Sequence, residues 1–285
     1  MAMPESANTR TVMVIGESNA GKTHYGAQLL QRLNSQKSVL QMRAMPSNMT
    51  AFEAAMRRIH DGLAAEHTSA TVSADSEWPI TAADGQMLDL IWPEYGGEQL
   101  NDILVNRQVP ATWRDRARTS DGWLVLARAN HHEVDGDFMS RPLSQLKQAP
   151  TVQPPYRHTS QARLIELLQM LLFMRGADVV AGRGIPRLAV VLSCWDELPA
   201  DLIARGPPDV LRTRMPMLAQ FVESVWPANL RSTLGLSALE RALDDKVVDE
   251  DFRDRGPEAF GYTVLGPNAR TPDLCIPLEH IAGWR

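Results

Sequence analysis

The sequence predicts an α/β fold in which helices cover both faces of a mostly parallel sheet, forming three layers. The first observation is an apolar run at 11–15 that is typical of a buried strand. The second is a glycine-rich turn directly after that run, followed by a helical pattern over 25–33. The third is the alternation of strand-like and helix-like stretches to the end of the 285 residues. This alternation is typical of strands joined by crossover helices, and we expect one domain with insertions over 1–285.

The glycine-rich turn reads G-E-S-N-A-G-K-T over 16–23, which is the P-loop pattern between a strand and a helix. Gly16 and Gly21 let the backbone turn tightly and approach phosphate oxygens. The N–H groups of 17–22 would form an anion-binding nest at the start of the helix. Lys22 would place its charge beside the β- and γ-phosphates of a nucleotide, and the Thr23 hydroxyl would ligate Mg2+. The predicted nucleotide contacts here are Gly16, Ser18, Asn19, Ala20, Gly21, Lys22, Thr23 and His24.

Composition and charge are those of an ordinary globular protein, with an apolar fraction of 44% and a charged fraction of 22%. The net charge of −5 argues against nucleic acid or an anionic membrane as the main partner. Cys194 and Cys275 both lie in apolar runs, so we expect buried thiols in a reducing cytoplasm. Residues 1–10 lack the apolar centre of a signal peptide, and no apolar run approaches the ~20 residues of a membrane helix.

After the P-loop, the pattern predicts a short strand, a helix and a hairpin. The strand spans 36–43, and apolar residues recur at helical spacing over 49–65. Two extended stretches, 78–82 and 86–92, flank Ala-Asp-Gly, and Asp-Gly is a strong hairpin signal. The second of these strands leads directly into an acidic, glycine-containing segment.

That segment reads P-E-Y-G-G-E over 93–98. In P-loop nucleotidases, a strand beside the P-loop strand ends in an acidic residue that holds Mg2+, usually through a water. We assign this role to Glu94, and we expect the N–H of Gly97 to reach the γ-phosphate. Asp89 is the other candidate for the acidic residue, but it would lie in the middle of the strand and too early.

The second half of the chain continues the alternation. Pro110 divides a helical stretch over 100–118 into two helices. The later predicted elements are strand 122–128, helix 160–175, strand 186–192, a helix within 207–226, strand 231–239, a charged helix and loop over 240–255, strand 260–265 and a last helix ending at Trp284.

Residues 129–158 break the alternation and are predicted to form a loop insertion. This stretch contains several side chains of the kinds that bind metals, which raises the alternative of a metal site. No second helix-spaced pair supports a metal, so we favour the loop. The side chains concerned are His131, His132, Glu133, Asp135 and Asp137.

The strand over 186–192 delivers the residues Ser-Cys-Trp-Asp to its carboxyl end, where ligands bind in open α/β sheets. Asp196 can accept two hydrogen bonds there from guanine N1 and N2, a donor pair that adenine lacks. The alternative is that Asp196 caps a following helix. Further along, Ser237 and Ala238 follow a strand at a point where a backbone N–H could meet guanine O6.

Taken in order, the motifs at 16–23, 94–97, 193–196 and 237–238 resemble the phosphate, magnesium, guanine and ribose-side motifs of Ras-like GTPases. The closer resemblance is to the bacterial double-GTPase family of translation-factor-related GTPases. Proteins of that family show an L-S-x-W-D-E-L stretch like 192–198, a D-x-x-G-E motif like 94–98 and a late Gly-Tyr strand like 261–262. The resemblance implies GTP and GDP binding with Mg2+, switching, and partner proteins encoded nearby in bacterial conflict or anti-phage gene clusters.

The chain departs in three respects from the pattern that the resemblance implies. Glu94 stands in place of the D-x-x-G aspartate, and Ser193 and Cys194 replace the asparagine and lysine of N-K-x-D, so half of the usual guanine clamp is missing. Glu98 replaces the glutamine that orients the attacking water. An ionised Glu98 would be repelled by the γ-phosphate, and we therefore expect slow intrinsic hydrolysis.

Two further roles follow from the resemblance. The switch threonine that closes on Mg2+ should lie just before the hairpin, and we choose Thr71 over Thr68. An arginine could offset the charge at position 98, either from a partner or from this chain. We favour Arg107, which follows the 94–98 segment by about two helical turns, over Arg128, which ends a buried strand.

Two other functions remain open on the sequence. One is an ATP-dependent P-loop enzyme, such as a kinase of a small molecule, with an acceptor pocket in the 129–158 loop. The other is a non-catalytic scaffold that binds nucleotide for stability and offers a surface to other proteins. Asp196 after a buried strand favours GTP, whereas loss of the water-orienting glutamine favours the scaffold.

Overall fold

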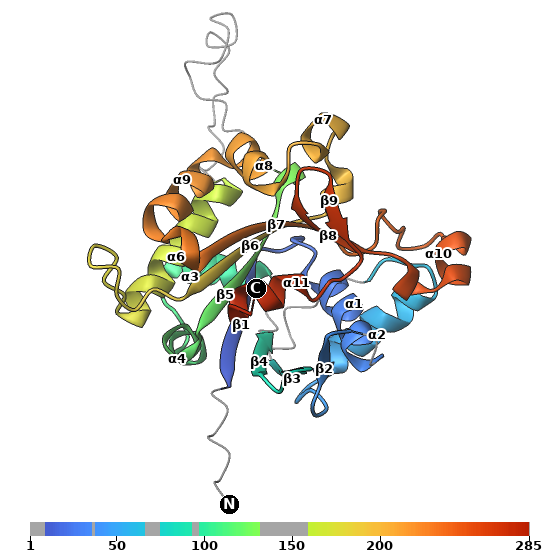
Figure 1. Ribbon diagram of the computed structural model, residues 1–285, viewed down its shortest axis with the longest axis horizontal. Helices are drawn as coiled ribbons and strands as arrows, with labels where there is room; N and C mark the ends of the chain where they lie inside the picture. Colours follow the sequence, from blue (N-terminus) through green and yellow to red (C-terminus); the bar gives the residue numbers. More distant parts are fainter. Residues whose placement is uncertain (1–8, 36–37, 66–74, 93–96, 132–158, 285) are drawn as a thin grey trace, which may run out of the picture.

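The computed structural model describes residues 9–35, 38–65, 75–92, 97–131 and 159–284, which form a nine-stranded sheet with helices on both faces (Figure 1). The strands lie in the order β2-β3-β4-β1-β5-β6-β7-β8-β9. Their bounds are β1 (Arg10–Gly16), β2 (Leu40–Met42), β3 (Ser76–Ala82), β4 (Met87–Trp92), β5 (Gly122–Arg128), β6 (Arg187–Ser193), β7 (Arg231–Ser237), β8 (Tyr262–Gly266) and β9 (Ala269–Thr271).

The sheet is mixed, which corrects the prediction of a mostly parallel sheet. β1 pairs in parallel with β4 and β5, β5 with β6, and β6 with β7. The four outer pairs, which involve β2, β3, β8 and β9, are antiparallel. The turn between β3 and β4 is too short for a parallel crossover, so this hairpin adds antiparallel strands to one side of the sheet.

The helices are divided between the two faces of the sheet. Figure 1 shows α3, α4, α6 and α9 on one side and α1, α2 and α11 on the other. The bounds of the helices are α1 (Lys22–Asn34), α2 (Thr50–His60), α3 (Gly97–Asn106), α4 (Ala111–Thr119), α6 (Ser160–Arg175), α7 (Ala200–Ile203), α8 (Pro207–Arg214), α9 (Pro216–Val225), α10 (Glu250–Arg255) and α11 (Ile276–Ala282).

Each central strand contributes side chains to two cores. Met13 and Ile15 of β1 belong to the core beneath α3, α4, α6, α8 and α9, whereas Val12 and Val14 belong to the core beneath α1 and α11. This division follows from the strand period, because successive side chains point to opposite faces. Both faces are covered by helices, which explains why the strand reads as a continuous apolar run.

Several predicted boundaries are confirmed. Pro110 lies between α3 and α4, at the N-cap position directly before α4. The helix predicted over 160–175 has the same bounds as α6, and it begins where the hydroxyl of Thr159 accepts from the N–H of Ala162 at 3.3 Å. The hairpin of β3 and β4 turns through a hydrogen bond from Gly85 N to Ala82 O at 3.0 Å.

Two helical predictions in the second half are corrected. The stretch 207–226 forms two helices, because Pro216 has no N–H to continue the first helix. The charged stretch 240–255 is helical only from Glu250. Before it, the carboxylate of Asp244 accepts from the N–H groups of Lys246 and Val247, and such local bonds compete with helix formation. The short strand β9 is an element that the pattern did not predict.

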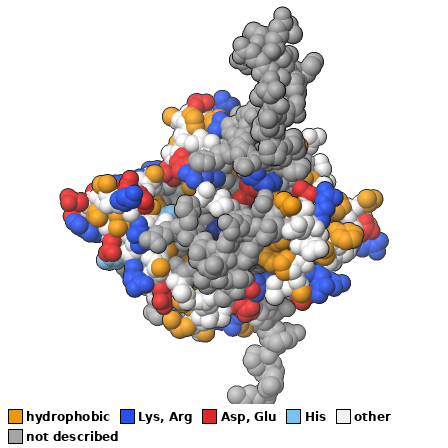
Figure 2. Space-filling model, turned by 180° about the vertical axis from the view of Figure 1, so that it is seen from behind, with side chains coloured by type: hydrophobic (Ala, Val, Ile, Leu, Met, Phe, Trp, Pro, Cys, Tyr) orange, Lys and Arg blue, Asp and Glu red, His pale blue; other side chains and the backbone are white. Residues whose placement is uncertain are grey.

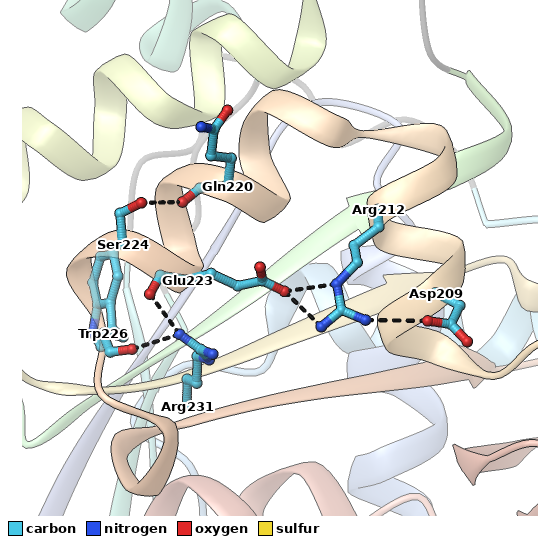
Figure 3. A network of polar contacts seen from close by, with 7 residues as sticks. All are labelled: Asp209, Arg212, Gln220, Glu223, Ser224, Trp226 and Arg231. Atoms are coloured by element: carbon cyan, nitrogen blue, oxygen red, sulfur yellow. Dashed lines mark hydrogen bonds and ion pairs between the residues drawn. The ribbon is translucent and has the colours of Figure 1, made fainter.

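A polar network ties α8 to α9, as Figure 3 shows. Arg212 of α8 donates through Nε to Glu223 of α9 at 2.9 Å and pairs with Asp209 one turn earlier in its own helix. Arg231, at the start of β7, donates to the backbone carbonyls of Glu223 and Trp226 at 2.8 and 2.7 Å. The network fixes the end of α9, whose last carbonyls have no partner within the helix.

The predicted insertion over 129–158 begins with a short 3-10 turn at Ala129–His131, labelled η1. Its remainder lies outside the described residues, and so do the other members of the histidine and acidic cluster. No helix in the described part of the chain is long and apolar enough to span a membrane.

The surface charge is mixed in sign. On the face seen in Figure 2, blue and red side chains are interspersed wherever side chains are coloured. This distribution agrees with the small net charge of −5.

Candidate functional site

The parallel strands bring the predicted site residues to one edge of the sheet. β1 ends at Gly16, β6 at Ser193 and β7 at Ser237, and all three run in the same direction. β5 lies between β1 and β6 and ends at Arg128. Ligands bind at the carboxyl edge of open α/β sheets, and the P-loop and Asp196 both follow strands at this edge.

The backbone of the P-loop has the conformation that its glycines allow. Gly21 has φ +74° and directly precedes α1. This left-handed conformation, which glycine adopts readily, turns the chain into the helix at the end that carries the free backbone N–H groups. A Cβ on Gly16 would lie 2.9 Å from the carbonyl oxygen of Leu126, which is closer than side chains tolerate. Ser18 and Asn19 are exposed at the top of the loop, whereas Ala20 is buried beneath it.

Lys22 lies inside the loop rather than in solvent. Its Nζ donates to the carbonyl oxygens of Gly16 at 2.8 Å and of Glu17 at 2.6 Å. Burial lowers the pKa of Lys22 to about 8, although the nearby charge of Glu17 opposes this shift. An incoming phosphate would place further negative charge beside this ammonium group, which backbone carbonyls hold in the loop.

Glu17 places a carboxylate in the P-loop, and an arginine neutralises it. Nε of Arg163, in the first turn of α6, donates to Glu17 at 2.5 Å. The same guanidinium donates to the hydroxyl of Ser160 at 3.2 Å. Sequence reasoning missed this pair, because the two residues are 146 positions apart and no motif contains both.

Asp196 lies in the short 3-10 turn Trp195–Glu197, labelled η2, which follows β6. Its Oδ1 accepts from the hydroxyl of Ser237 at 2.5 Å, and that hydroxyl accepts from the N–H of Glu240 at 2.9 Å. The alternative that Asp196 caps a helix is wrong, because the next helix, α7, begins after Pro199 and has no side-chain cap. The structure thus brings Asp196 and Ser237 together, as the guanine prediction requires, and Ala238 follows Ser237 half-buried.

Ser193 and Cys194 pack against the P-loop from the β6 side. A Cβ on Gly21 would lie 3.7 Å from Ser193 Cβ and 3.6 Å from Cys194 Sγ. Burial raises the pKa of the Cys194 thiol to about 12, so it is neutral. The hydroxyl of Ser193 is buried beside the P-loop, next to the thiol of Cys194.

Arg128 bridges the two halves of the site. It donates to both carboxylate oxygens of Glu197, through Nε at 2.9 Å and through a second, shorter bond, and to the carbonyl oxygen of Asn19 at 3.3 Å. Burial acts to lower its pKa, but the bond to Glu197 and the neighbouring charges outweigh burial and raise the pKa. Arg128 therefore stays charged between the P-loop and the Asp196 turn.

Arg107 has a different partner from the one that the sequence suggested. It follows α3, has an exposed side chain (79%) and pairs with Glu166 of α6 at 3.1 Å. The role of Arg107 near the γ-phosphate stays a prediction, and of the two arginines it is Arg128 that contacts a P-loop residue, Asn19.

Asp89 is excluded as the acidic residue that would hold Mg2+. In the register of the sheet it lies beside Thr11, at the opposite end of β1 from the P-loop. Its carboxylate pairs with Arg43. Glu94, the favoured candidate, lies outside the described residues, as do Thr71 and Thr68.

The remaining predicted residues are described only in part. Gly97 begins α3, and Glu98 lies in its first turn, but the side chain of Glu98 is outside the described features. His24 lies in the first turn of α1, where its Nε2 accepts from the N–H of Ala65 at 3.2 Å. This bond links the P-loop helix to the chain that follows α2.

The local geometry fits a bound nucleoside polyphosphate. The loop offers a half-buried lysine, a helix N-terminus, a cradle that a Cβ would fill and, beside it, a buried hydroxyl. Of the predicted Mg2+ ligands, the structure describes Thr23, half-buried in the first turn of α1. Within the described ranges there is no cluster of three metal-binding side chains.

A P-loop at the carboxyl edge of an α/β sheet, with a buried serine at the end of β6 and an aspartate in the turn that follows, defines a P-loop nucleotide-binding protein. The family model Double-GTPase 1 matches residues 13–281. The chain therefore belongs to the Double-GTPase 1 family and is a GTP-binding protein. A comparison with curated proteins gave no match.

Among solved structures, the chain is similar to the bacterial selenocysteine-specific elongation factor EF-Sec (12% identity, 75% of this chain and 23% of that one, TM-score 0.34). It is also similar to the GTPase-like domain of Ski7 from S. cerevisiae (13% identity, 80% of this chain and 43% of that one, TM-score 0.41). A third similar structure is the Arl6 small GTPase from Trypanosoma brucei (11% identity, 76% of this chain and 82% of that one, TM-score 0.35). The chain spans less than half the length of the first two.

Proposed function

We propose that this protein is a GTP-binding switch with slow intrinsic GTP hydrolysis that acts together with partner proteins. The observation that carries the proposal is the arrangement of charge at one edge of the sheet. A half-buried cation, Lys22, and a carboxylate, Asp196, follow strands that are separated only by β5. A cation suits the phosphates of the nucleotide, and a carboxylate suits the guanine base.

The phosphate side of the site would be formed by the P-loop. Lys22 would exchange its two carbonyl acceptors for phosphate oxygens, and the N–H groups of 17–22 would surround the β-phosphate. Thr23 would hold Mg2+, with Thr71 and Glu94 as the proposed ligands from the rest of the chain. Bound Mg2+ would neutralise charge on the β- and γ-phosphate oxygens.

The base side would be formed by the turn after β6. Guanine presents N1–H and the N2 amine on one edge, and Asp196 would accept from both. Ser237 donates to Oδ1 of the same carboxylate, which holds the side chain in one rotamer. The N–H of Ala238 would donate to guanine O6, and a site built to pair with these groups would discriminate against adenine.

Hydrolysis would proceed by attack of water on the γ-phosphate, with the developing charge stabilised by Lys22. Slow turnover is proposed because Glu98 replaces the glutamine that orients the water in Ras-like proteins. To act on the γ-phosphate, Arg107 would first have to leave Glu166. An arginine from a partner is the simpler source, and such arginines contribute roughly 10³–10⁵ in rate in related switches.

The partner proteins are proposed from the family resemblance. The bacterial double-GTPase family is associated with conflict and anti-phage gene clusters, and we extend a defence or regulatory role to this chain on that basis. A switch of this kind would offer its partners a surface that depends on whether GTP or GDP is bound.

Nucleotide-dependent thermal stabilisation tests the proposal. A ligand that binds only the folded state stabilises it by RT ln(1 + [L]/Kd), and at 100 times Kd we expect GTP and GDP with Mg2+ to raise Tm by about 4–5 °C. ATP should give no comparable rise, and Lys22→Ala should abolish the rise with all nucleotides. Equal stabilisation by ATP would favour the ATP-dependent enzyme instead. Stabilisation by GTP without any turnover would favour the scaffold.

A base-swap experiment tests the role of Asp196 directly. In Asp196→Asn the amide oxygen can still accept from Ser237, which would leave the amide N–H2 facing the base. Xanthine carries a carbonyl where guanine carries the N2 amine, so the variant should bind XDP more tightly than GDP. We expect GDP affinity to fall at least about tenfold, because charge-assisted bonds are lost. Unchanged GDP affinity in a folded variant would contradict the guanine assignment.

A further inference from the structure

We propose that Arg128 is a positioning residue that ties the base-recognition turn, residues 193–197, to the P-loop and thereby sets the selectivity for guanine. This inference rests on the proposed function, because it concerns how Asp196 is held. It assigns Arg128 to the base side of the site and not to the γ-phosphate.

The contacts of Arg128 reach both halves of the site. Its guanidinium donates hydrogen bonds to both carboxylate oxygens of Glu197. Its NH1 donates to the carbonyl oxygen of Asn19 in the P-loop at 3.3 Å. Both partners of the ion pair are largely shielded, with side-chain exposures of 24% and 20%. A bidentate arginine–carboxylate pair fixes orientation as well as distance.

The sheet register explains why an arginine at this position can span the gap. Arg128 is paired with Ser193 at the end of β5 and β6, and Leu126 is paired with Gly16 at the end of β1. Arg128 therefore leaves the sheet between the strand that delivers the P-loop and the strand that delivers the turn. Arg214 of α8 donates to the carbonyl of Ala129 at 3.3 Å and so supports the chain just after Arg128.

Asp196 is held by its two neighbours in the turn. On one side, Trp195 is fully buried and packs so closely on β7 that a Cβ on Gly235 would lie 2.5 Å from its ring. On the other side, Glu197 is held by Arg128. With both neighbours fixed, the Cα of Asp196 has little freedom, and the hydroxyl of Ser237 sets its rotamer. Release of Glu197 would free one end of this short turn.

The turn also needs a cation for electrostatic reasons. It carries two successive carboxylates, Asp196 and Glu197, next to a loop that would hold a polyphosphate. Cys194 carries no charge, because its thiol stays protonated. Arg128 neutralises Glu197, which leaves Asp196 as the carboxylate of the turn that is directed to the base. Without Arg128, like charges would push the turn away from the nucleotide.

The experiment compares nucleotides that differ in the base and lack a γ-phosphate. Equilibrium affinities for GDP, IDP and ADP, and the release rate of GDP, would be measured for the wild type, Arg128→Met, Glu197→Gln and the double variant. IDP lacks the N2 amine, so it reports on the second hydrogen bond to Asp196. The matched control is Arg212→Met, which breaks another arginine–glutamate pair, the one between α8 and α9 in Figure 3.

We expect Arg128→Met to weaken GDP binding about tenfold while ADP binding changes little, so that the selectivity falls. Glu197→Gln should weaken GDP binding in the same direction, and the double variant should lose no more than Arg128→Met, because all three remove one interaction. GDP release should be faster in each of these three variants than in the wild type. Arg212→Met should keep the wild-type ratio of GDP to ADP affinity.

Three results would overturn the inference. An unchanged GDP to ADP ratio in both single variants, in a wild type that prefers GDP, would contradict it and leave the proposed function intact. A fall in the GTP hydrolysis rate at saturating GTP, with GDP selectivity unaltered, would make Arg128 a catalytic residue instead. A wild type without preference for GDP would reject the proposed function and this inference together. If Arg128→Met does not fold, Glu197→Gln tests the same bridge from its other end.

Discussion

Lys22 is a cation held where charge is disfavoured. Its ammonium group is buried in the P-loop and bonded to two backbone carbonyls, and burial lowers its pKa from the usual 10.5 to about 8. In the free protein, Lys22 is therefore neutral in a growing fraction of molecules above pH 8. A bound polyphosphate would restore the charge, so nucleotide binding and protonation of Lys22 are linked.

The first prediction is that nucleotide affinity falls as pH rises above about 8. Below this pH the free protein already carries the proton, and Lys22 adds no pH dependence. Above it, binding must take up a proton, and affinity should fall by up to about tenfold for each pH unit. Calorimetric titration in two buffers of different ionisation heat would measure this uptake, approaching one proton at pH 9 and near zero at pH 7. The absence of uptake at pH 9 would show that Lys22 is not the group that meets the phosphates.

The same shift has the opposite consequence for the stability of the nucleotide-free protein. Between pH 8 and 10.5 the unfolded chain binds more protons at Lys22 than the folded chain does. The contribution of Lys22 to the free energy of unfolding therefore rises with pH across this window. At neutral pH, the charged Lys22 in the P-loop therefore lowers the free energy of unfolding of the nucleotide-free protein.

At the scale of elements, β7 and the turn after β6 depend on each other at one close contact. Gly235 of β7 lies under the ring of Trp195, and no side chain fits between them. The ring is fully buried in the core that α6 and α9 cover. The strand and the turn therefore pack as one unit, and the position of Asp196 depends on a residue in a different strand.

The second prediction is that Gly235→Ala lowers the free energy of unfolding by about 1–3 kcal/mol, because the added methyl forces Trp195 to shift. Urea unfolding would measure the loss. Gly266→Ala in β8 is the matched control, since a Cβ there meets nothing within 4 Å, and it should change stability by about 0.5 kcal/mol or less. Equal stability of the two variants would mean that the contact between Trp195 and β7 is loose.

Helices α4 and α6 are also joined by a polar contact at their ends. Nη1 of Arg175, the last residue of α6, donates to the carbonyls of Ala117, Arg118 and Ser120 at 2.8, 3.1 and 2.6 Å. These carbonyls end α4 and have no partner within that helix. One guanidinium thus caps a neighbouring helix, at the opposite end of α6 from Arg163.

The third prediction follows from this cap. Arg175→Met should lower the free energy of unfolding by about 1–3 kcal/mol, because part-buried carbonyls lose their donor. The exposed Arg183, in the loop after α6, supplies the control variant Arg183→Met, which should be neutral. Denaturant titration compares the two. Because Arg175 lies far along α6 from the P-loop, a change in GDP selectivity in Arg175→Met would contradict the account of the site given above.

At the scale of the whole molecule, the two cores share their central strands. β1, β5 and β6 each contribute alternate side chains to both cores, so neither core can form without the same three strands. The sheet is also continuous from β2 to β9. This sharing is the physical basis for expecting one cooperative unit over the described chain.

The fourth prediction is a single calorimetric unfolding transition that shifts as a whole when GDP and Mg2+ are added. The ligand binds at the edge where the central strands end, and its free energy is coupled to both cores through those strands. Differential scanning calorimetry with and without GDP would check this. Two transitions, of which GDP moves only one, would divide the chain into separate domains and contradict the expectation of one domain over 1–285.

Predictions from local patterns succeeded where the pattern lies within one short segment. The P-loop, the Asp-Gly hairpin, the break at Pro110 and the bounds of α6 were all readable, because turn residues and apolar spacing act on neighbouring residues. The mixed sheet was not readable from the sequence, because β9 spans only the three residues Ala269–Thr271 and so short a stretch shows no clear alternation. The 207–226 stretch was predicted as a single helix, because its helical spacing continues across Pro216, where the structure begins a second helix.

For the site, spacing along the chain singled out Lys22 and Asp196 as candidates, and the structure places both at the carboxyl edge of the sheet. The sequence also identified the Double-GTPase family, because the motifs of that family are runs of consecutive residues. Spacing along the chain could not predict the partners of Arg128 and Arg163. Arg128 meets Glu197 across 69 positions and Arg163 meets Glu17 across 146, and only the folded sheet brings such residues within bonding distance. Local patterns therefore named the groups that would bind GTP, whereas the tertiary structure decided what holds them in place, because hydrogen bonds depend on distances in space rather than along the chain.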